Sequence, residues 1–297
     1  MKPRCLVIAP HGQVGFEAVR ALSPHWDIVT AARQRADHVA DLDQPATLAG
    51  LVERIAPAVV VNAAAWTAVD RAEAEPEAAW RANAEAPGAL ARGCAAVGAL
   101  LVHYSTDYVF DGSGEAPRDE DAATAPRSSY GKSKWAGEQA VRDSGCAHLI
   151  LRTQWVYAAR GQNFLRTMLK LAGRESLAIV DDQYGAPTPA RWLGAALAPL
   201  LERARASAAP PRATYHLVAG GETHWLSFAE AIFDGALRRG LIERRPLLQP
   251  VSTEAYGAPA PRPKNGRLSG ARLAAAYGIG LPDWRGGLAQ VLDELAR

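Results

Sequence analysis

The stretch CLVIAPHGQVG, residues 5–15, places a run of apolar residues directly before a turn that contains two glycines. The apolar run from Cys5 to Ala9 predicts a strand that is buried on both faces of a sheet. Gly12 and Gly15 permit a tight turn and a close approach of the backbone to a bound diphosphate. The following helix, with apolar residues at helical spacing from Val14 to Leu22, offers free N–H groups to an anion. The stretch therefore predicts the opening strand, turn and helix of a dinucleotide-binding fold.

Ala9 occupies the place at which this kind of turn ordinarily has its first glycine. An alanine is tolerated there without strain only if its φ angle is negative, because the left-handed region favours glycine. We therefore expect a negative φ at Ala9 and some loss of cofactor affinity.

Short apolar runs and helical patterns continue to alternate through the first half of the chain. We predict strands at residues 28–30, 59–61, 100–104 and 149–151, and helices at residues 45–55, 76–97 and 129–142. This alternation is typical of an α/β protein with a Rossmann-type doubly wound parallel sheet. Residues 1–155 are expected to form this core. Residues 156–297 are expected to form mostly a smaller substrate-binding lobe, interleaved with the last strands of the sheet.

Composition excludes several other classes of protein. Among 297 residues, 48% are hydrophobic and 22% charged, and the net charge of +2 gives no reason to expect nucleic acid or a membrane as a partner. No run reaches the roughly 20 apolar residues of a membrane-spanning helix. Three cysteines lie far apart, without the spacing of a metal site or a disulfide framework. We expect a cytoplasmic protein.

The residues after the second predicted strand bear on the choice of cofactor. An acidic residue there would bind the ribose 2′-hydroxyl of NAD, whereas an arginine favours the 2′-phosphate of NADP. The chain has Ala31–Ala32–Arg33–Gln34–Arg35 at this point, without an acid. The sequence therefore predicts a preference for NADPH, with NADH possible, and Arg33 as the contact.

Tyr130 and Lys134 lie four residues apart at the start of a predicted helix, on one helical face. A nearby ammonium lowers the pKa of a phenol, so Tyr130 is expected to act as the proton donor in the reduction of a ketone. Thr106 follows the fourth predicted strand, at the edge of the sheet where such folds bind ligands, and is expected to bond the substrate carbonyl. We predict Thr106, Tyr130 and Lys134 as the catalytic residues.

At this point the sequence resembles a known family. The segment STDYVFDG, residues 105–112, followed by Tyr130 and Lys134, is similar to the extended short-chain dehydrogenase/reductases that act on nucleotide sugars. NAAAWTAVD at 62–70, RTQWVY at 152–157, DQYGAPT at 182–188 and YHLV at 215–218 narrow the resemblance to the dTDP-4-dehydrorhamnose reductases. It covers essentially the whole chain. It implies reduction of the 4-keto group of dTDP-4-dehydro-L-rhamnose to dTDP-L-rhamnose with NADPH.

The resemblance also implies roles for individual residues. The expected cofactor-binding residues are Gly12, Gln13, Val14, Gly15, Arg33, Asp41, Leu42, Ala63, Ala64, Ala65, Thr67, Tyr104, Tyr130 and Lys134. The expected substrate-binding residues are Thr106, Asp107, Trp155, Arg262, Asn265 and Arg267. Arginine suits a diphosphate because its planar fork pairs with two oxygens at once.

Some members of the family dimerise around a divalent ion held by three glutamates. Glu17 and Glu294 match two of these positions, but Arg191 stands at the third. Because an arginine repels a cation, we expect no metal, and a Glu–Arg contact in its place. A homodimer stays possible.

Other functions on the same scaffold stay open. A 4,6-dehydratase needs a glutamate beside its Asp, and Tyr108 stands there; an epimerase retains NAD tightly, which the missing acid after the second strand disfavours. A non-catalytic NADP-binding regulatory subunit would not need the intact Thr106, Tyr130 and Lys134. Asn83 could order a catalytic water chain or simply be an exposed helical residue.

Overall fold

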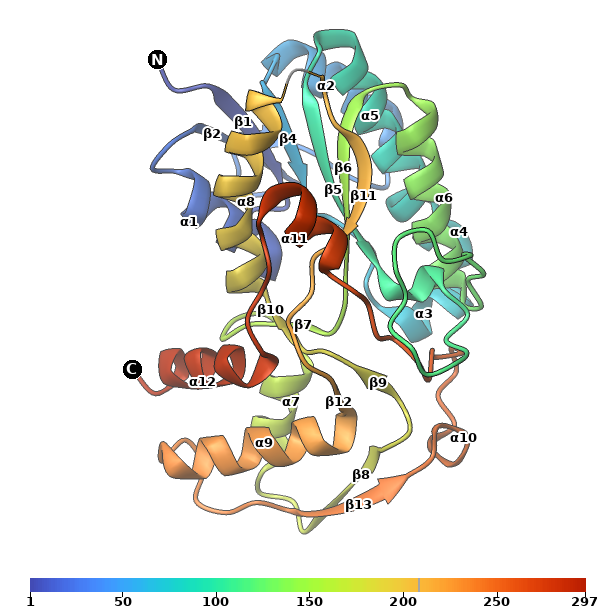
Figure 1. Ribbon diagram of the computed structural model, residues 1–297, viewed down its shortest axis with the longest axis vertical. Helices are drawn as coiled ribbons and strands as arrows, with labels where there is room; N and C mark the ends of the chain where they lie inside the picture. The colour runs from blue at the N-terminus through green and yellow to red at the C-terminus, as the bar shows by residue number, and fades with distance from the viewer. Residues whose placement is uncertain (208) are drawn as a thin grey trace.

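A seven-stranded parallel sheet forms the centre of the larger part of the computed structural model, which describes residues 1–207 and 209–297 (Figure 1). The strands lie in the order β11 (Arg212–His216), β6 (Ala147–Thr153), β5 (Leu100–Thr106), β4 (Val59–Asn62), β1 (Arg4–Ile8), β2 (Asp27–Ala32) and β3 (His38–Val39). Chain order reverses between β1 and β4, which is the topological switch point where such sheets bind ligands. The predicted Rossmann-type doubly wound sheet is confirmed.

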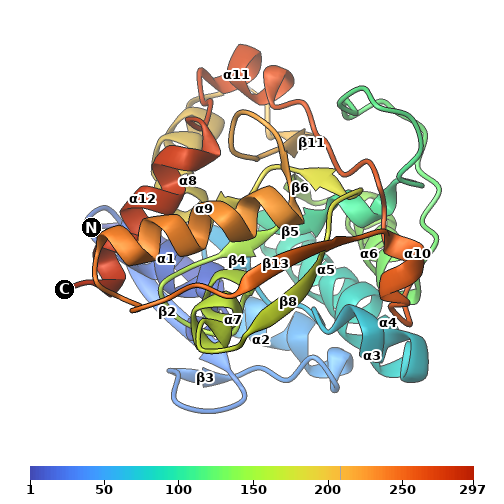
Figure 2. The same ribbon diagram turned by 90° about the horizontal axis from the view of Figure 1, so that it is seen from below.

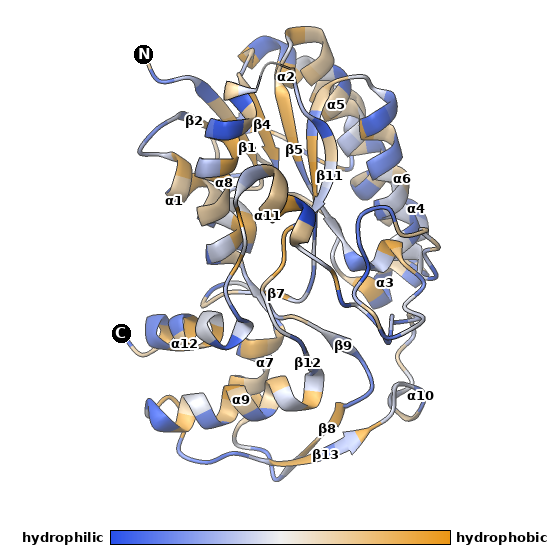
Figure 3. Ribbon diagram, viewed as in Figure 1, coloured by the Kyte–Doolittle hydropathy of each residue, from blue (hydrophilic) through white to orange (hydrophobic). Residues whose placement is uncertain are grey.

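The central strands are apolar because both of their faces are covered. Every residue of β4 and β5 is buried, and β1, β4 and β5 are the most hydrophobic part of the sheet in Figure 3. One face packs against α1 (Gln13–Leu22), α8 (Ala190–Ala206) and α11 (Ala271–Tyr277). The other packs against α2 (Leu48–Ile55), which follows the 3-10 turn η1 (Pro45–Thr47), α5 (Ala86–Val97) and α6 (Ser129–Asp143).

The helix predicted at residues 76–97 is interrupted. The structure has α4 (Pro76–Trp80), a π-helical turn η2 (Arg81–Glu85) and then α5. Pro87 explains the interruption, because it lacks the N–H that would bond the carbonyl of Asn83 in a regular α-helix. That carbonyl instead lies against Gly137 of α6, where a Cβ would come within 2.0 Å of it. The turn thereby brings α5 and α6 into close contact.

The second half of the chain contributes to both parts of the molecule. α8, β11 and α11 belong to the sheet and its covering helices, whereas the remaining elements lie beneath its carboxyl edge, most of them around a separate apolar core (Figures 1 and 2). These elements are β7 (Val156–Tyr157), α7 (Phe164–Leu171), β8 (Ser176–Val180), β9 (Tyr184–Gly185), β10 (Thr188–Pro189), β12 (Thr223–His224), α9 (Trp225–Arg238), β13 (Leu247–Val251), α10 (Thr253–Tyr256) and α12 (Trp284–Leu295). We call this part the lobe.

The helices and the cysteines bear on the predicted class of protein. Within residues 1–207 and 209–297, no helix combines the length and the apolar character required to cross a membrane. Cys5, Cys94 and Cys146 are buried free thiols.

Candidate functional site

The glycine turn joins β1 to α1. Gly12 is the N-cap of α1, and the first turn of that helix carries no acidic residue and no capping side chain. Gly15 packs so tightly on the turn that an added Cβ would lie 2.0 Å from the carbonyl oxygen of Ala9. The N–H groups at the start of α1 therefore remain available to an anion, as the cofactor prediction requires.

The conformation of Ala9 corrects the sequence-based expectation. Its φ is +60°, in the left-handed region, rather than negative. The turn imposes this angle, because the carbonyl of Ala9 must accept the N–H of Gly12 at 3.1 Å while its own N–H donates to Ala31 at 2.9 Å. An alanine in this region costs about 1–2 kcal/mol.

Ala9→Gly is accordingly expected to raise the free energy of unfolding by about 1 kcal/mol, because the relief of strain exceeds the added flexibility of the unfolded chain. Chemical denaturation measures this. Ala198→Gly, a half-buried position inside α8, is the matched control and should lose about 1 kcal/mol. A destabilised Ala9→Gly variant would show that the left-handed turn imposes no strain on Ala9.

Arg33 and Arg35 lie in the loop after β2, and both residues are exposed. Nε2 of His11 in the turn lies 2.7 Å from the carbonyl oxygen of Arg35, which ties the two loops together. Asp37, which the sequence reading passed over, accepts bonds at 2.8 Å from the N–H and the hydroxyl of Thr30, and these bonds lower its pKa. One oxygen of its carboxylate is therefore engaged within the loop, and Arg33 remains the residue predicted to contact the cofactor.

The segment after β4, residues 63–67, is held in place by Asn83. The side chain of Asn83 accepts from the N–H of Trp66 at 2.9 Å and donates to its carbonyl at 3.1 Å. It also donates to the hydroxyl of Ser133 on α6 at 3.0 Å. Asn83 is fully buried, so it is not an exposed helical residue. It positions the segment that contains Ala63, Ala64, Ala65 and Thr67.

The remaining expected cofactor residues lie around the same edge of the sheet. Asp41 and Leu42 follow β3, which the sequence did not predict because a two-residue strand has no periodicity. The hydroxyl of Tyr104 donates to the carbonyl of Leu193 on α8 at 3.3 Å, so its ring lies in the core. The backbone carbonyl of Tyr104 faces the other way, toward Lys134.

Tyr130 and Lys134 come from the first turns of α6, which begins because Ser128 caps it through a 3.0 Å bond from the N–H of Gly131. Both side chains are buried. Nζ of Lys134 donates to the carbonyl of Tyr104 at 2.6 Å, and burial lowers the pKa of Lys134 to about 8. The ring of Tyr130 meets Tyr108 edge-on, with centroids 5.3 Å apart.

The electrostatics of Tyr130 also differ from the expectation. Burial raises its pKa above the ordinary value, while hydrogen bonding by Thr106 acts in the opposite direction. The predicted lowering of this pKa by Lys134 is therefore wrong for the chain alone, because the ammonium bonds the backbone of Tyr104. A protonated phenol at neutral pH suits a group that donates a proton.

Asp107 is buried beside Thr106, the threonine predicted to be catalytic. Its Oδ1 accepts from the hydroxyl of Thr106 at 3.0 Å, and its Oδ2 has no partner among the described residues. Burial raises the pKa of this carboxyl to about 7. An unpaired buried carboxyl oxygen at the carboxyl end of β5 is suited to bonding a polar ligand.

Trp155 forms an aromatic wall with a residue that the sequence did not single out. Its φ is +47°, and its indole stacks on Trp225 of α9 with centroids 3.7 Å apart and an angle of 15° between the planes. Nε1 of Trp225 donates to Gln183 at 3.1 Å, which fixes the pair. The positive φ turns the indole of Trp155 toward the lobe.

The C-terminal segment supplies Arg262, Asn265 and Arg267. Arg262 pairs with Asp70 at 2.8 Å and reaches the hydroxyl of Tyr108 at 3.4 Å, and Tyr108 in turn contacts Tyr130. Arg267 pairs with Glu222. The amide of Asn265 donates to the carbonyls of residues 113 and 116, so it braces the loop after β5.

The positions of the expected metal site form charge pairs. Arg191 on α8 lies 3.5 Å from Glu294 on α12, and Arg20 pairs with the buried Glu17. The expected Glu–Arg contact is thus present.

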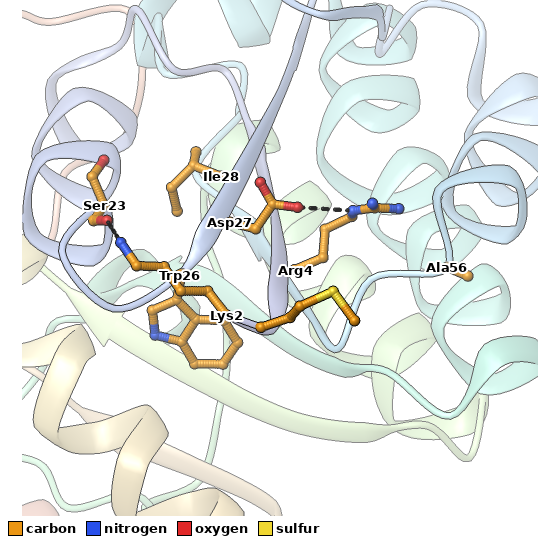
Figure 4. A pocket seen from close by; sticks show the side chains of 8 residues that line it. Lys2, Arg4, Ser23, Trp26, Asp27, Ile28 and Ala56 are labelled. Carbon is orange, nitrogen blue, oxygen red and sulfur yellow. Dashed lines mark hydrogen bonds and ion pairs between the residues drawn. The ribbon is translucent and has the colours of Figure 1, made fainter.

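A hollow at the amino-terminal edge of the sheet is a weaker candidate. Figure 4 shows Lys2 donating to the carbonyl of Ser23 and Arg4 paired with Asp27. Both cations are already engaged, and the hollow lies at the edge opposite to the one where these sheets bind ligands.

Comparisons with known proteins agree with this geometry. The sequence model described as the RmlD substrate binding domain matches residues 3–297. A dTDP-4-dehydrorhamnose reductase from Burkholderia thailandensis is 48% identical over 95% of both chains, and one from Shigella flexneri is 44% identical over 98% of this chain and 97% of that protein. The structure of such a reductase from Bacillus anthracis, in complex with NADP, has a TM-score of 0.89 and 33% identity, and covers 99% of this chain and 100% of that one.

Proposed function

The chain belongs to the dTDP-4-dehydrorhamnose reductase family, and from this membership we propose that it reduces dTDP-4-dehydro-L-rhamnose to dTDP-L-rhamnose with NADPH. The observation that supports this most is the meeting of Thr106, Asp107, Tyr130 and Lys134 at the carboxyl end of β5. A hydroxyl, a carboxyl, a phenol and an ammonium at one place match the needs of carbonyl reduction.

The residues around the glycine turn fit a dinucleotide. Gly12, Gln13 and Val14 begin α1, whose uncapped N–H groups would hold the diphosphate, and Gly15 allows the close packing that the turn needs. Arg33 would bind the 2′-phosphate. Asp41, Leu42 and residues 63–65 and 67 would line the groove. NADPH, when bound, supplies the hydride that reduces the ketone.

Tyr130 donates its phenolic proton to the oxygen that becomes negative as the ketone is reduced. Its raised pKa keeps that proton in place until the charge develops. Thr106 bonds the same oxygen and orients it. Lys134 would hold the cofactor ribose.

The substrate would lie between the sheet and the lobe. Asp107 would bond a sugar hydroxyl, and Trp155, stacked on Trp225, would pack against the sugar ring. Arg262 and Arg267 would face the diphosphate, while Asn265 would act through the loop that it braces. On this division, residues 1–155 form the cofactor-binding core and 156–297 contribute mostly to the substrate-binding lobe.

Assembly and surroundings follow from the same family membership. We propose a cytoplasmic enzyme that can form a homodimer across the face of Glu17, Arg191 and Glu294, with no nucleic acid or membrane as a partner. At that face the Arg191–Glu294 pair takes the place of an ion.

Removal of divalent ions is therefore expected to leave kcat/KM unchanged, within about twofold, because Arg191 supplies the positive charge. The test compares initial rates after dialysis against a chelator, with and without added Mg²⁺. Activity that the chelator abolishes and Mg²⁺ restores would disprove the replacement of the metal.

The proposed function is tested by NADPH oxidation in the presence of dTDP-, GDP- and UDP-linked 4-keto sugars. We expect turnover with the dTDP-linked 6-deoxy-4-keto sugar. Net turnover only with a different nucleotide, or none with any, would overturn the proposal.

A further inference from the structure

A loop of the lobe lies on the first turn of α1. This loop, residues 158–163, connects β7 to α7 and is far from α1 in the sequence. Nδ2 of Asn163 donates to Oε1 of Gln13 at 2.8 Å, and a Cβ on Gly161 would lie 3.0 Å from Cγ of Gln13. The guanidinium carbon of Arg160 lies 3.3 Å from the ring centroid of Phe16, in the same turn of α1.

The loop is held in one shape by Asn163. Besides Gln13, the amide of Asn163 bonds the carbonyls of Ala158 at 2.9 Å and Arg160 at 3.1 Å. Its Oδ1 accepts from the N–H of Arg166 at 3.0 Å and so caps α7. The hydrogen bonds of Asn163 therefore fix the backbone of the loop from which the side chain of Arg160 extends.

Within residues 1–207 and 209–297, Arg160 forms no salt bridge with a carboxylate. A cation near the N-terminus of a helix is unfavourable, because that end carries partial positive charge. The first turn of α1 carries no acid, and the NH1 nitrogen of Arg160 is buried without a partner among the described residues. A buried guanidinium nitrogen without a hydrogen-bond partner requires an acceptor, and the N-terminus of a helix favours an anion in that role.

We propose that Arg160 binds the cofactor diphosphate and that residues 158–163 form a clamp that joins the lobe to the bound dinucleotide. This inference rests on the proposed use of NADPH. The diphosphate is the anion we infer, because in this fold it would lie at the start of the first helix, where Gln13 and Phe16 are, whereas the 2′-phosphate would lie beyond β2, near Arg33.

The test measures dissociation constants of NADH and NADPH for the full chain by calorimetry. Arg160→Gln is expected to weaken both by about 10- to 100-fold and to leave their ratio unchanged, because both dinucleotides carry the diphosphate. Arg33→Gln should weaken NADPH alone. Arg174→Gln, an exposed arginine just after α7, should change neither constant. Arg160→Lys, which keeps the charge but loses the fork, should lie between wild type and Arg160→Gln.

The other possible results of the binding measurements distinguish the inference from the proposed function. A loss confined to NADPH would place Arg160 on the 2′-phosphate, and unchanged constants would leave it without a ligand; either result overturns the inference while the proposed function stands. A wild-type chain that binds neither dinucleotide would overturn both. A thermal unfolding midpoint for each variant shows whether a lost affinity reflects lost structure.

Discussion

Tyr130→Phe is expected to lower kcat by about three orders of magnitude while the dissociation constant of NADPH changes little, in the range that general acid catalysis contributes. The ring stays, so its edge contact with Tyr108 is preserved, and only the proton donor is removed. Without the donor, Thr106 is left to bond the oxygen that becomes negative. Steady-state kinetics and cofactor titration measure the two quantities separately.

Tyr157→Phe is the matched control for this variant. Its hydroxyl is buried in the lobe without a partner among the described residues, so its removal should change kcat less than about twofold. If Tyr130→Phe retains more than a tenth of the wild-type kcat, the phenol is not the proton donor.

Asp107→Asn is expected to stabilise the folded chain at alkaline pH while weakening substrate binding. Burial raises the pKa of Asp107 from 3.8 to about 7, so folding favours the protonated form. The stability contributed by this proton is present below pH 4 and is lost as pH rises toward 7. Three pKa units correspond to at most about 4 kcal/mol, and between pH 5 and pH 8 the advantage of Asn should grow by roughly 2–3 kcal/mol.

Urea denaturation at pH 5 and pH 8 measures this difference. Asp143→Asn, at the exposed end of α6, should show no comparable growth with pH. A stability difference for Asp107→Asn that is independent of pH would mean that the carboxyl is ionised at little cost. A raised KM for the nucleotide sugar should accompany the added stability. The buried carboxyl that would bind the sugar lowers the stability of the unliganded fold, so its removal improves stability at the expense of binding.

Much of the fold could be predicted from the sequence because its signals are local. The apolar strands after Arg4, Pro57 and Ala99 and the Gly12–Gly15 turn need no knowledge of distant residues, and each proved to be in the sheet or at its switch point. The elements that the sequence did not predict are short and are formed through contacts with distant residues. β3 pairs through two residues, and α3 (Val69–Ala74) has too few turns for periodicity.

In the candidate site, too, the features that depend on neighbouring residues were predicted, and those that depend on distant residues were not. Tyr130 and Lys134 are near neighbours in the sequence, so their shared helical face was visible. The stacking of Trp155 on Trp225 joins residues that are far apart in the sequence. The hydrogen bonds between the side chain of Asn83 and the backbone of Trp66 depend on the π-helical turn that Pro87 produces. The φ of Ala9 was predicted with the wrong sign because the hydrogen bonds that impose it involve Ala31 on another strand.

The central claim is hydride transfer from NADPH to the 4-keto carbon of a dTDP-linked sugar. In the most direct test, the enzyme is given NADPH that carries deuterium at C4 of the nicotinamide, in the position of the hydrogen that is transferred. Mass spectrometry and NMR then locate the deuterium in the product. We predict one deuterium at C4 of the dTDP-linked sugar for each NADPH oxidised. Product without deuterium, or label that stays in the nicotinamide while the sugar is epimerised or dehydrated, would contradict it.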